Sequence, residues 1–188
     1  MKQKIILIFS ILFICFMTGL LIYYLIKGDS SRWQVSLGGI LASGLPLLLL
    51  RMKEIPFNIP IIFGYFIFLF CSLFLGSISS FYLHYKWWDS TLHFYKGMYI
   101  GFVGIPLFKT MIPTHVRDDV SVWMVALFVL SLAALASVLW EIYEFVGDLT
   151  FTHTMQRGGN KDTMLDLLSG MAGGLLPAFY ALLKKKKG

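Results

Sequence analysis

Long apolar runs separated by short polar segments dominate the chain. Six runs are long enough to cross a bilayer, since about 20 residues at 1.5 Å rise cover the roughly 30 Å hydrocarbon core. Backbone groups find no water in that core, so the runs are predicted to be helical. The expected spans are residues 5–26, 33–50, 59–82, 91–112, 120–147 and 163–183. The pattern predicts an all-α, polytopic integral membrane protein with about six transmembrane helices.

The segments that connect the expected spans are too short to fold by themselves, and the longest covers residues 148–162. We therefore predict a single transmembrane domain over residues 1–188. Lys2 and Lys4 precede the first span as they would precede a signal peptide. That span has about 22 apolar residues, more than a typical signal-peptide core, and no small-residue cleavage motif follows it, so we expect it to be retained.

Composition supports a membrane protein and argues against a nucleic-acid-binding one. Hydrophobic residues make up 57% of the chain and charged residues 14%, whereas an ordinary soluble domain has about 25% charged residues. The net charge of +6 comes largely from connections and the C-terminal lysines rather than from a basic domain face. Cys15 and Cys71 lie in the middle of different spans and are interpreted as packing residues.

Lysine and arginine are distributed unequally between the two sides of the membrane. With six spans, both termini lie on the same side, which holds ten of these residues against six on the other. The ten are Lys2, Lys4, Arg51, Lys53, Lys109, Arg117 and the four lysines at 184–187; the six are Lys27, Arg32, Lys86, Lys96, Arg157 and Lys161. The positive-inside rule therefore predicts that both termini are cytoplasmic.

Charged residues inside spans are expensive and are functional candidates by default. Here they gather at one end of three spans, at spacings that place each set on one helix face. They are Asp89, His93 and Lys96 in the fourth span, Glu141, Glu144 and Asp148 in the fifth, and Asp162 and Asp166 in the sixth. The predicted topology brings all three sets to the same level, near the outer interface.

Carboxylates at one level cannot all ionise without sharing protons, pairing with cations or binding a metal. Carboxylates and a histidine on neighbouring helices are a known way to build a metal site in a bundle. The predicted ligands are Asp89, His93, Glu141, Glu144 and Asp166, supported by Lys96, Asp148, Gln156 and Asp162. Such ligands suit Mg²⁺, Mn²⁺, Ca²⁺, Zn²⁺ or iron.

Simpler interpretations of the same residues remain open. Asp89 and Asp162 lie where helices begin and can cap them. Glu144 and Asp148 can be wetted interfacial residues, and His93 alone can be a packing histidine. Gly97 with Gly101, and Gly170 with Gly174, form small-xxx-small pairs that favour close helix packing. Three glycines and Pro46 in the second span favour a kink.

Three ordered motifs resemble the YjdF-like family of bacterial inner-membrane proteins. Residues 89–97 match its D-S-x-x-H-F-x-x-G signature and residues 141–145 its E-x-x-E-aromatic element. Gln156, Asp162 and Asp166 resemble its final segment, although Lys161 stands where the family has Trp and Gly159 where it has Asp. A looser similarity exists to VanZ-like membrane proteins. The resemblance implies an all-helical fold in a bacterial cytoplasmic membrane and supplies no reaction.

Three functions fit the sequence. The first is an enzyme that uses a metal or a carboxylate–histidine pair against a lipid or lipid-linked substrate, with His93 or Glu141 as base. The second is a non-catalytic protein in which the charged residues hold helices together or bind a partner. The third is an ion-coupled transporter, which is less favoured because the charges lie at one membrane face.

Overall fold

The computed structural model describes residues 1–188 except 118, 151–154, 157 and 185–188. The described part is all-helical, with 87% helix and no strand, so the predicted fold class is confirmed. Arg157 and Lys185, Lys186 and Lys187, which entered the topology prediction, lie outside the described residues. The chain divides into two compact units, Met1–Trp88 and Asp89–Gly188. That the two units form a single domain stays a prediction.

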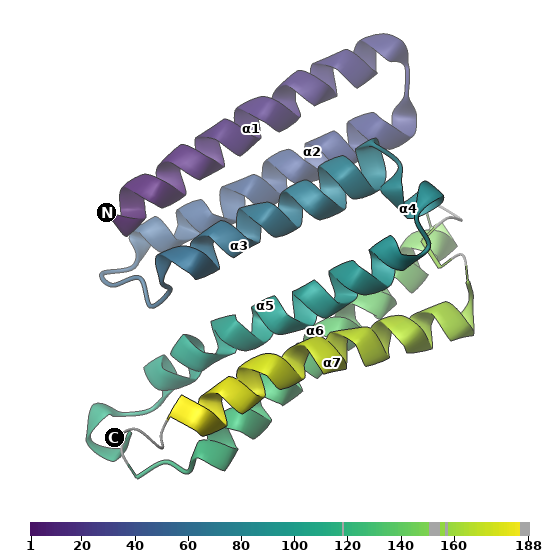
Figure 1. The fold of residues 1–188 in the computed structure, drawn as a ribbon. Helices are drawn as coiled ribbons and strands as arrows, with labels where there is room; N and C mark the ends of the chain where they lie inside the picture. Colours follow the sequence, from purple (N-terminus) through teal and green to yellow (C-terminus); the bar gives the residue numbers. More distant parts are fainter. Residues whose placement is uncertain (118, 151–154, 157, 185–188) are drawn as a thin grey trace. The chain divides into compact units, whose positions relative to one another are not determined.

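The first unit is built from three long helical segments and a short helix. Its elements are α1 (Lys2–Lys27), α2 (Ser30–Gly44), η1 (Leu45–Arg51), α3 (Ile59–Leu69), η2 (Phe70–Ile78) and α4 (Phe81–His84). Figure 1 shows α1, α2 and α3 side by side, in agreement with the contacts among them. Buried Ile6 on α1 packs with Ile62, Phe66 and Leu69 on α3 to form the core of this unit.

Polar residues fix the turn between α1 and α2. Gly28 ends α1 in the left-handed conformation, at φ 69°, which glycine adopts without steric cost. The Asp29 carboxylate then caps α2 by accepting from the Arg32 backbone N–H at 3.1 Å. Hydrogen bonds from Arg32 also lower the pKa of the Asp29 carboxyl group. The Arg32 guanidinium donates further to the Ile78 carbonyl and to Ser80 Oγ, which ties the start of α2 to the end of η2.

The second and third expected spans are not uniform α-helices. The second changes from α-helix to 3₁₀-helix at Leu45–Arg51, beside Pro46, where the glycines and proline favoured a kink. The third continues α3 as a π-helix over Phe70–Ile78 and ends there, before the expected Tyr82. Its last residues form a separate short helix after Ser80, which has a positive φ of 64°.

The second unit consists of three long helices, α5 (Trp87–Met111), α6 (Val122–Thr150) and α7 (Asn160–Lys184), with a short 3₁₀ segment η3 (Thr114–Val116). Glycines let these helices approach closely. A Cβ on Gly97 of α5 would overlap the Gly170 carbonyl oxygen of α7, and a Cβ on Gly170 would overlap Ser137 Oγ of α6. The expected packing role of these two glycines therefore has a direct structural basis.

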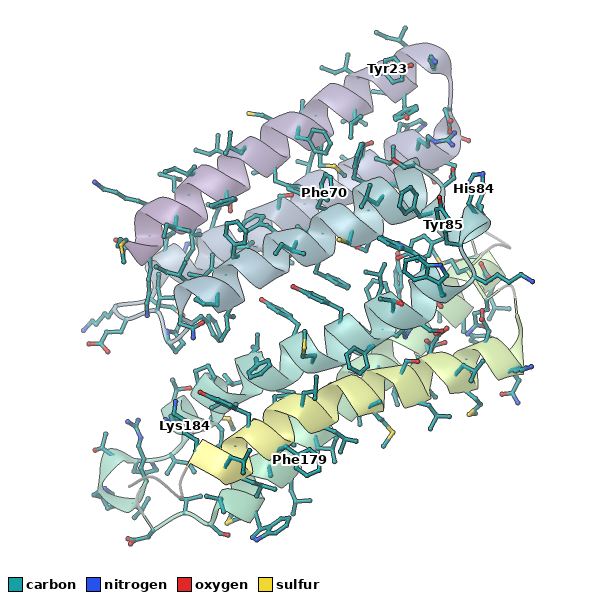
Figure 2. The ribbon with its side chains drawn as sticks, in the orientation of Figure 1. Tyr23, Phe70, His84, Tyr85, Phe179 and Lys184 are labelled. Atoms are coloured by element: carbon teal, nitrogen blue, oxygen red, sulfur yellow. The ribbon has the colours of Figure 1, made fainter. Side chains whose placement is uncertain are left out.

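Within the described part of the chain, five segments are long and apolar enough to cross a membrane, one fewer than the six expected. They are Lys2–Lys27, Ser30–Arg51, Ile59–Ile78, Val122–Thr150 and Asn160–Lys184. The difference lies at α5, which covers the fourth expected span but carries Asp89, His93 and Lys96 in its first half. Figure 2 shows apolar side chains such as Tyr23 and Phe179 projecting from the helices, and both are about half exposed.

Candidate functional site

Helix α5 contributes three polar side chains on one face. Asp89, His93 and Lys96 follow one another at i, i+4 and i+7, a spacing that places them in a row along a helix. His93 is 2% exposed and Lys96 is 6% exposed, whereas the Asp89 side chain is 27% exposed. The row therefore runs from the partly accessible start of α5 to a buried position about two turns further along.

Helix α6 faces this row with two glutamates. Glu141 is 5% exposed. Glu144 is partly buried and its carboxylate accepts a hydrogen bond from the Trp140 indole N–H at 2.7 Å. Trp140 and Glu144 are four residues apart and so lie on the same side of α6.

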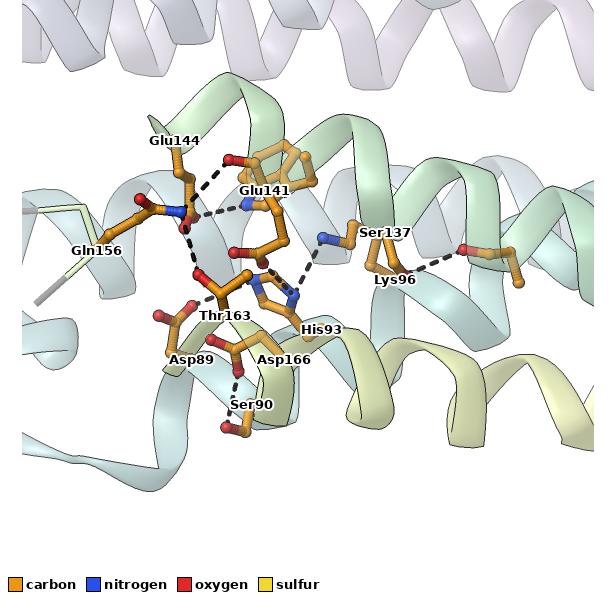
Figure 3. Close-up of polar contacts among 12 residues, drawn as sticks. Asp89, Ser90, His93, Lys96, Ser137, Glu141, Glu144, Gln156, Thr163 and Asp166 are labelled. Atoms are coloured by element: carbon orange, nitrogen blue, oxygen red, sulfur yellow. Dashed lines mark hydrogen bonds and ion pairs between the residues drawn. The ribbon is translucent and has the colours of Figure 1, made fainter. Parts of the chain in front are cut away.

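Helix α7 supplies Asp166, which is 2% exposed. Its Oδ1 accepts a hydrogen bond from Ser90 Oγ of α5 at 2.8 Å. Asp89, His93, Lys96, Glu141, Glu144 and Asp166 are called the polar cluster below. Figure 3 shows these side chains converging from the three helices.

The imidazole of His93 is the centre of the polar cluster. Its Nε2 lies 3.6 Å from Asp89 Oδ1, and its Nδ1 lies 3.4 Å from Glu141 Oε1. The Lys96 ammonium lies 3.3 Å from the same Nδ1 and 4.6 Å from the centroid of the Trp140 ring. One ring nitrogen therefore faces a carboxylate alone, and the other faces a carboxylate and an ammonium.

Two buried polar atoms of the polar cluster have no hydrogen-bond partner among the residues that the structure describes. They are His93 Nε2 and Glu141 Oε1. Buried polar side-chain atoms are nearly always hydrogen-bonded, so each exception calls for an explanation such as a bound ion or water. Both atoms lie in a group of four carboxyl groups and one ammonium, which favours a further cation on charge grounds.

Two sets of donor atoms have the spacing of a metal site. The first is Asp89, His93 and Asp166, and the second is His93, Glu141 and Glu144. Within each set, the donor atoms lie within 4.8 Å of one another. Ligands about 2.1 Å from a common ion lie about 3–4 Å apart, so a modest contraction would complete either site. The five residues predicted as ligands are thus brought together, and their metal role stays a prediction.

Three of the four residues expected to support the site, Asp148, Gln156 and Asp162, make hydrogen bonds between the end of α6 and the start of α7, whereas Lys96 lies beside His93. The Asp148 carboxylate accepts from the backbone N–H groups of Met155 and Gln156 at 2.9–3.1 Å. The Gln156 carboxamide donates to Thr163 Oγ1 of α7 and to the Glu141 carbonyl of α6. Asp162 accepts from the Gly158 N–H at 3.2 Å, as an acidic residue at a helix start does.

Three residues that sequence reasoning did not assign to the site also contact its members. Ser90 binds Asp166, Trp140 binds Glu144, and Thr163 binds Gln156. A signal existed for the first two. Ser90 belongs to the D-S-x-x-H-F motif, and Trp140 precedes Glu144 by one helical turn.

The polar cluster lies near one end of the three-helix unit. Asp89 is in the first turn of α5. Glu144 lies six residues before the end of α6, and Asp166 lies six residues after the start of α7. At 1.5 Å per residue, these positions are within about 10 Å of the helix ends. In a bilayer, this depth corresponds to the boundary between hydrocarbon and head groups.

An all-helical fold with five membrane-length apolar segments defines a polytopic membrane protein. Residues 8–187 match the family described as "Predicted membrane protein (DUF2238)", and the chain belongs to this family. The YjdF-like proteins form the same family, so that resemblance is confirmed, whereas the looser similarity to VanZ-like proteins gains no support. The chain has no significant match among curated proteins or solved structures.

Proposed function

We propose that the protein is a metal-dependent membrane enzyme whose divalent cation is held by Asp89, His93 and Asp166. The observation that carries this proposal is the Nε2 atom of His93. It is buried, has no hydrogen-bond partner in the described part of the chain, and faces the Asp89 carboxylate at 3.6 Å. An imidazole nitrogen with two carboxylates is a donor set that suits Mn²⁺, Mg²⁺ or Zn²⁺.

The Nε2 side of His93 is favoured over the Nδ1 side because of Lys96. Its ammonium already lies 3.3 Å from Nδ1 and would repel a divalent ion there. In the part of the site that the structure describes, the first donor set has no comparable competing cation on its histidine nitrogen.

Glu141 completes an arrangement that is common around metal ions. A histidine that binds a metal through one nitrogen usually donates its other N–H to a carboxylate or carbonyl, which fixes the tautomer and ring orientation. Glu141 Oε1 lies 3.4 Å from His93 Nδ1 and has no hydrogen-bond partner among the described residues. In the tautomer that would bind a metal through Nε2, Nδ1–H would donate to this oxygen, and the Lys96 ammonium would no longer donate to Nδ1. We assign Glu141 the role of orienting His93.

Catalysis, rather than a structural role for the ion, is favoured by the number of ligands. Three protein ligands leave coordination positions open, as in catalytic rather than structural metal sites. A bound divalent ion can lower the pKa of coordinated water and polarise an ester or phosphoryl oxygen. Because the polar cluster lies at head-group depth, the proposed substrate is a lipid or a lipid-linked precursor, and the proposed reaction is its hydrolysis.

Metal analysis tests the binding half of this proposal. Full-length protein purified in detergent is expected to bind about one divalent ion per chain by elemental analysis after dialysis against Mn²⁺ or Zn²⁺. Asp166→Asn and His93→Gln are expected to abolish binding. Asp119→Asn and His115→Gln, which change exposed residues of the same types, are the matched controls. Absence of a bound ion in the wild type would reject the site.

Lipid analysis tests the catalytic half. Liposomes of phosphatidylglycerol and phosphatidylethanolamine, with and without a lipid extract of the host, are incubated with protein loaded with metal. New lipid products in mass spectra that disappear with EDTA and with Asp166→Asn would support hydrolysis. Metal binding without any metal-dependent product would instead favour the non-catalytic role, in which the ion joins three helices.

A further inference from the structure

The polar cluster contains two overlapping places for a cation, and they share His93. One is formed by Asp89, His93 and Asp166, and the other by His93, Glu141 and Glu144. Both sets include buried carboxylates, so each attracts positive charge. Charge alone would not confine a divalent ion to one of them.

Lys96 lies beside the second of these places. It is 6% exposed, and its Nζ lies 3.3 Å from His93 Nδ1, the nitrogen that belongs to this place. Glu141 and Glu144 belong to the same place, so their carboxylates attract this ammonium. Nζ also lies 4.6 Å from the centroid of the Trp140 ring, whose negative face attracts a cation.

The position of Lys96 follows from helical spacing. Lys96 is three residues after His93, so the two side chains are neighbours on α5. A lysine ammonium carries one charge and is tethered to the helix, so it needs no cation from solution to remain in place. A second, divalent ion beside it would meet strong repulsion because the site is buried.

We infer that the Lys96 ammonium holds the place of a second cation and confines divalent-ion binding to the Asp89–His93–Asp166 side. Lys96 is therefore a specificity-determining residue for the site. This inference rests on the proposed cation site, but the two make separable statements. The proposed function concerns the ion that the wild-type protein binds. The inference concerns a second cation-binding position, formed by Glu141 and Glu144, which becomes available only when Lys96 is replaced.

Divalent-ion titration of Lys96→Gln tests the inference, because this change removes the charge and keeps a polar side chain. Mn²⁺ binding to full-length protein in detergent is measured by equilibrium dialysis and elemental analysis, with and without Glu144→Gln. In the wild type, Glu144→Gln is expected to leave the dissociation constant nearly unchanged, because Glu144 is not a ligand of the proposed ion. Lys96→Gln is expected to gain a second bound ion, held by the Glu141 and Glu144 carboxylates because the protonated Nδ1 of His93 offers no lone pair, and Glu144→Gln is expected to remove that gain.

The controls separate this inference from the proposed function. Lys161→Gln, at an exposed position in the first turn of α7, should leave Mn²⁺ binding unchanged.

If Lys96→Gln keeps wild-type stoichiometry and remains insensitive to Glu144→Gln, the inference is wrong and the proposed site stands. If only Lys96→Gln binds Mn²⁺, the proposed wild-type site fails and Lys96 confines no ion to it, which overturns the inference as stated, although Lys96 would still block the position formed by Glu141 and Glu144. Binding by neither protein overturns both. Lys96→Met, which keeps the apolar stem, is titrated in parallel as a second charge-removing variant.

Discussion

Nδ1 of His93 lies 3.4 Å from Oε1 of Glu141, and both side chains are almost completely buried. The two residues belong to different helices, α5 and α6, which run in opposite directions so that the start of one meets the end of the other. With Nδ1 beside Glu141, the imidazole has its Nε2 directed toward the Asp89 carboxylate, 3.6 Å away. The proposed metal site depends on it.

Replacing Glu141 is therefore expected to weaken metal binding without removing a ligand. Loss of such an orienting partner typically lowers metal affinity about 10–100-fold. Isothermal titration of Glu141→Gln with Mn²⁺ should show a reduction in this range, and Glu54→Gln, at an exposed glutamate, should show none. Complete loss of binding would instead make Glu141 a direct ligand.

Asp166 and Glu141 are expected to act as a unit. Both are within reach of His93, and residues that share one network show coupling of about 0.5–3 kcal/mol. The double variant Glu141→Gln/Asp166→Asn should be little worse than Asp166→Asn alone in the free energy of unfolding, measured for all four proteins in the same Mn²⁺ buffer. A double-mutant cycle measures the coupling, and strictly additive effects would contradict a shared site.

Asp89 and Asp162 should respond differently to the same change. Both open helices, but Asp89 faces His93 Nε2 at 3.6 Å, whereas Asp162 accepts from the Gly158 N–H. Asn can still accept from a backbone N–H at a helix start, so Asp162→Asn should alter stability by only a few tenths of a kcal/mol. Asp89→Asn should sharply lower Mn²⁺ affinity. Equal, small effects of both changes would show that Asp89 is only a helix-start residue.

The sequence predicted which polar residues share a helix face, but it did not predict which side chains contact one another across helices. Helical spacing placed Asp89, His93 and Lys96 on one face, because that face follows from 3.6 residues per turn. Which carboxylate meets which ring nitrogen depends on the rotation of α5, α6 and α7 about their axes, and spacing within each helix carries no such information. The Asp166–Ser90 hydrogen bond was missed for this reason.

The pattern of apolar residues also did not predict every irregular helical segment. The run 59–82 reads as one span because its residues are uniformly apolar, yet it changes to a π-helix at Phe70 and ends at Ile78. A π-turn depends on local backbone hydrogen bonding rather than on hydropathy. By contrast, Pro46 signalled the change at Leu45–Arg51, since proline lacks an N–H and disrupts a regular helix.

The orientation of the unit in the membrane is a further expectation. Lys96 is buried in the polar cluster, so it does not contact head groups. Without Lys96, the excess of basic residues on the side of the termini is larger than the count of ten against six. A reporter active only outside the cytoplasm should be active when fused after Gly159 and inactive when fused after Lys184. The reverse pattern would place the polar cluster at the cytoplasmic face.

Close contact between α5 and α7 should be needed for the site to form. A Cβ on Gly97 would overlap the Gly170 carbonyl oxygen, and a backbone atom on a packed helix cannot move aside as a flexible side chain can. Overpacking of this kind typically costs about 1–3 kcal/mol. Gly97→Ala should therefore lower the free energy of unfolding in detergent by at least about 1 kcal/mol and reduce Mn²⁺ affinity, because Asp166 moves away from His93.

Gly38→Ala is the matched control, since a Cβ there meets nothing within 4 Å and alanine is the better helix former. If Gly97→Ala binds Mn²⁺ as the wild type does, then Asp166 does not need its present distance from His93, and the assignment of Asp166 as a ligand is wrong.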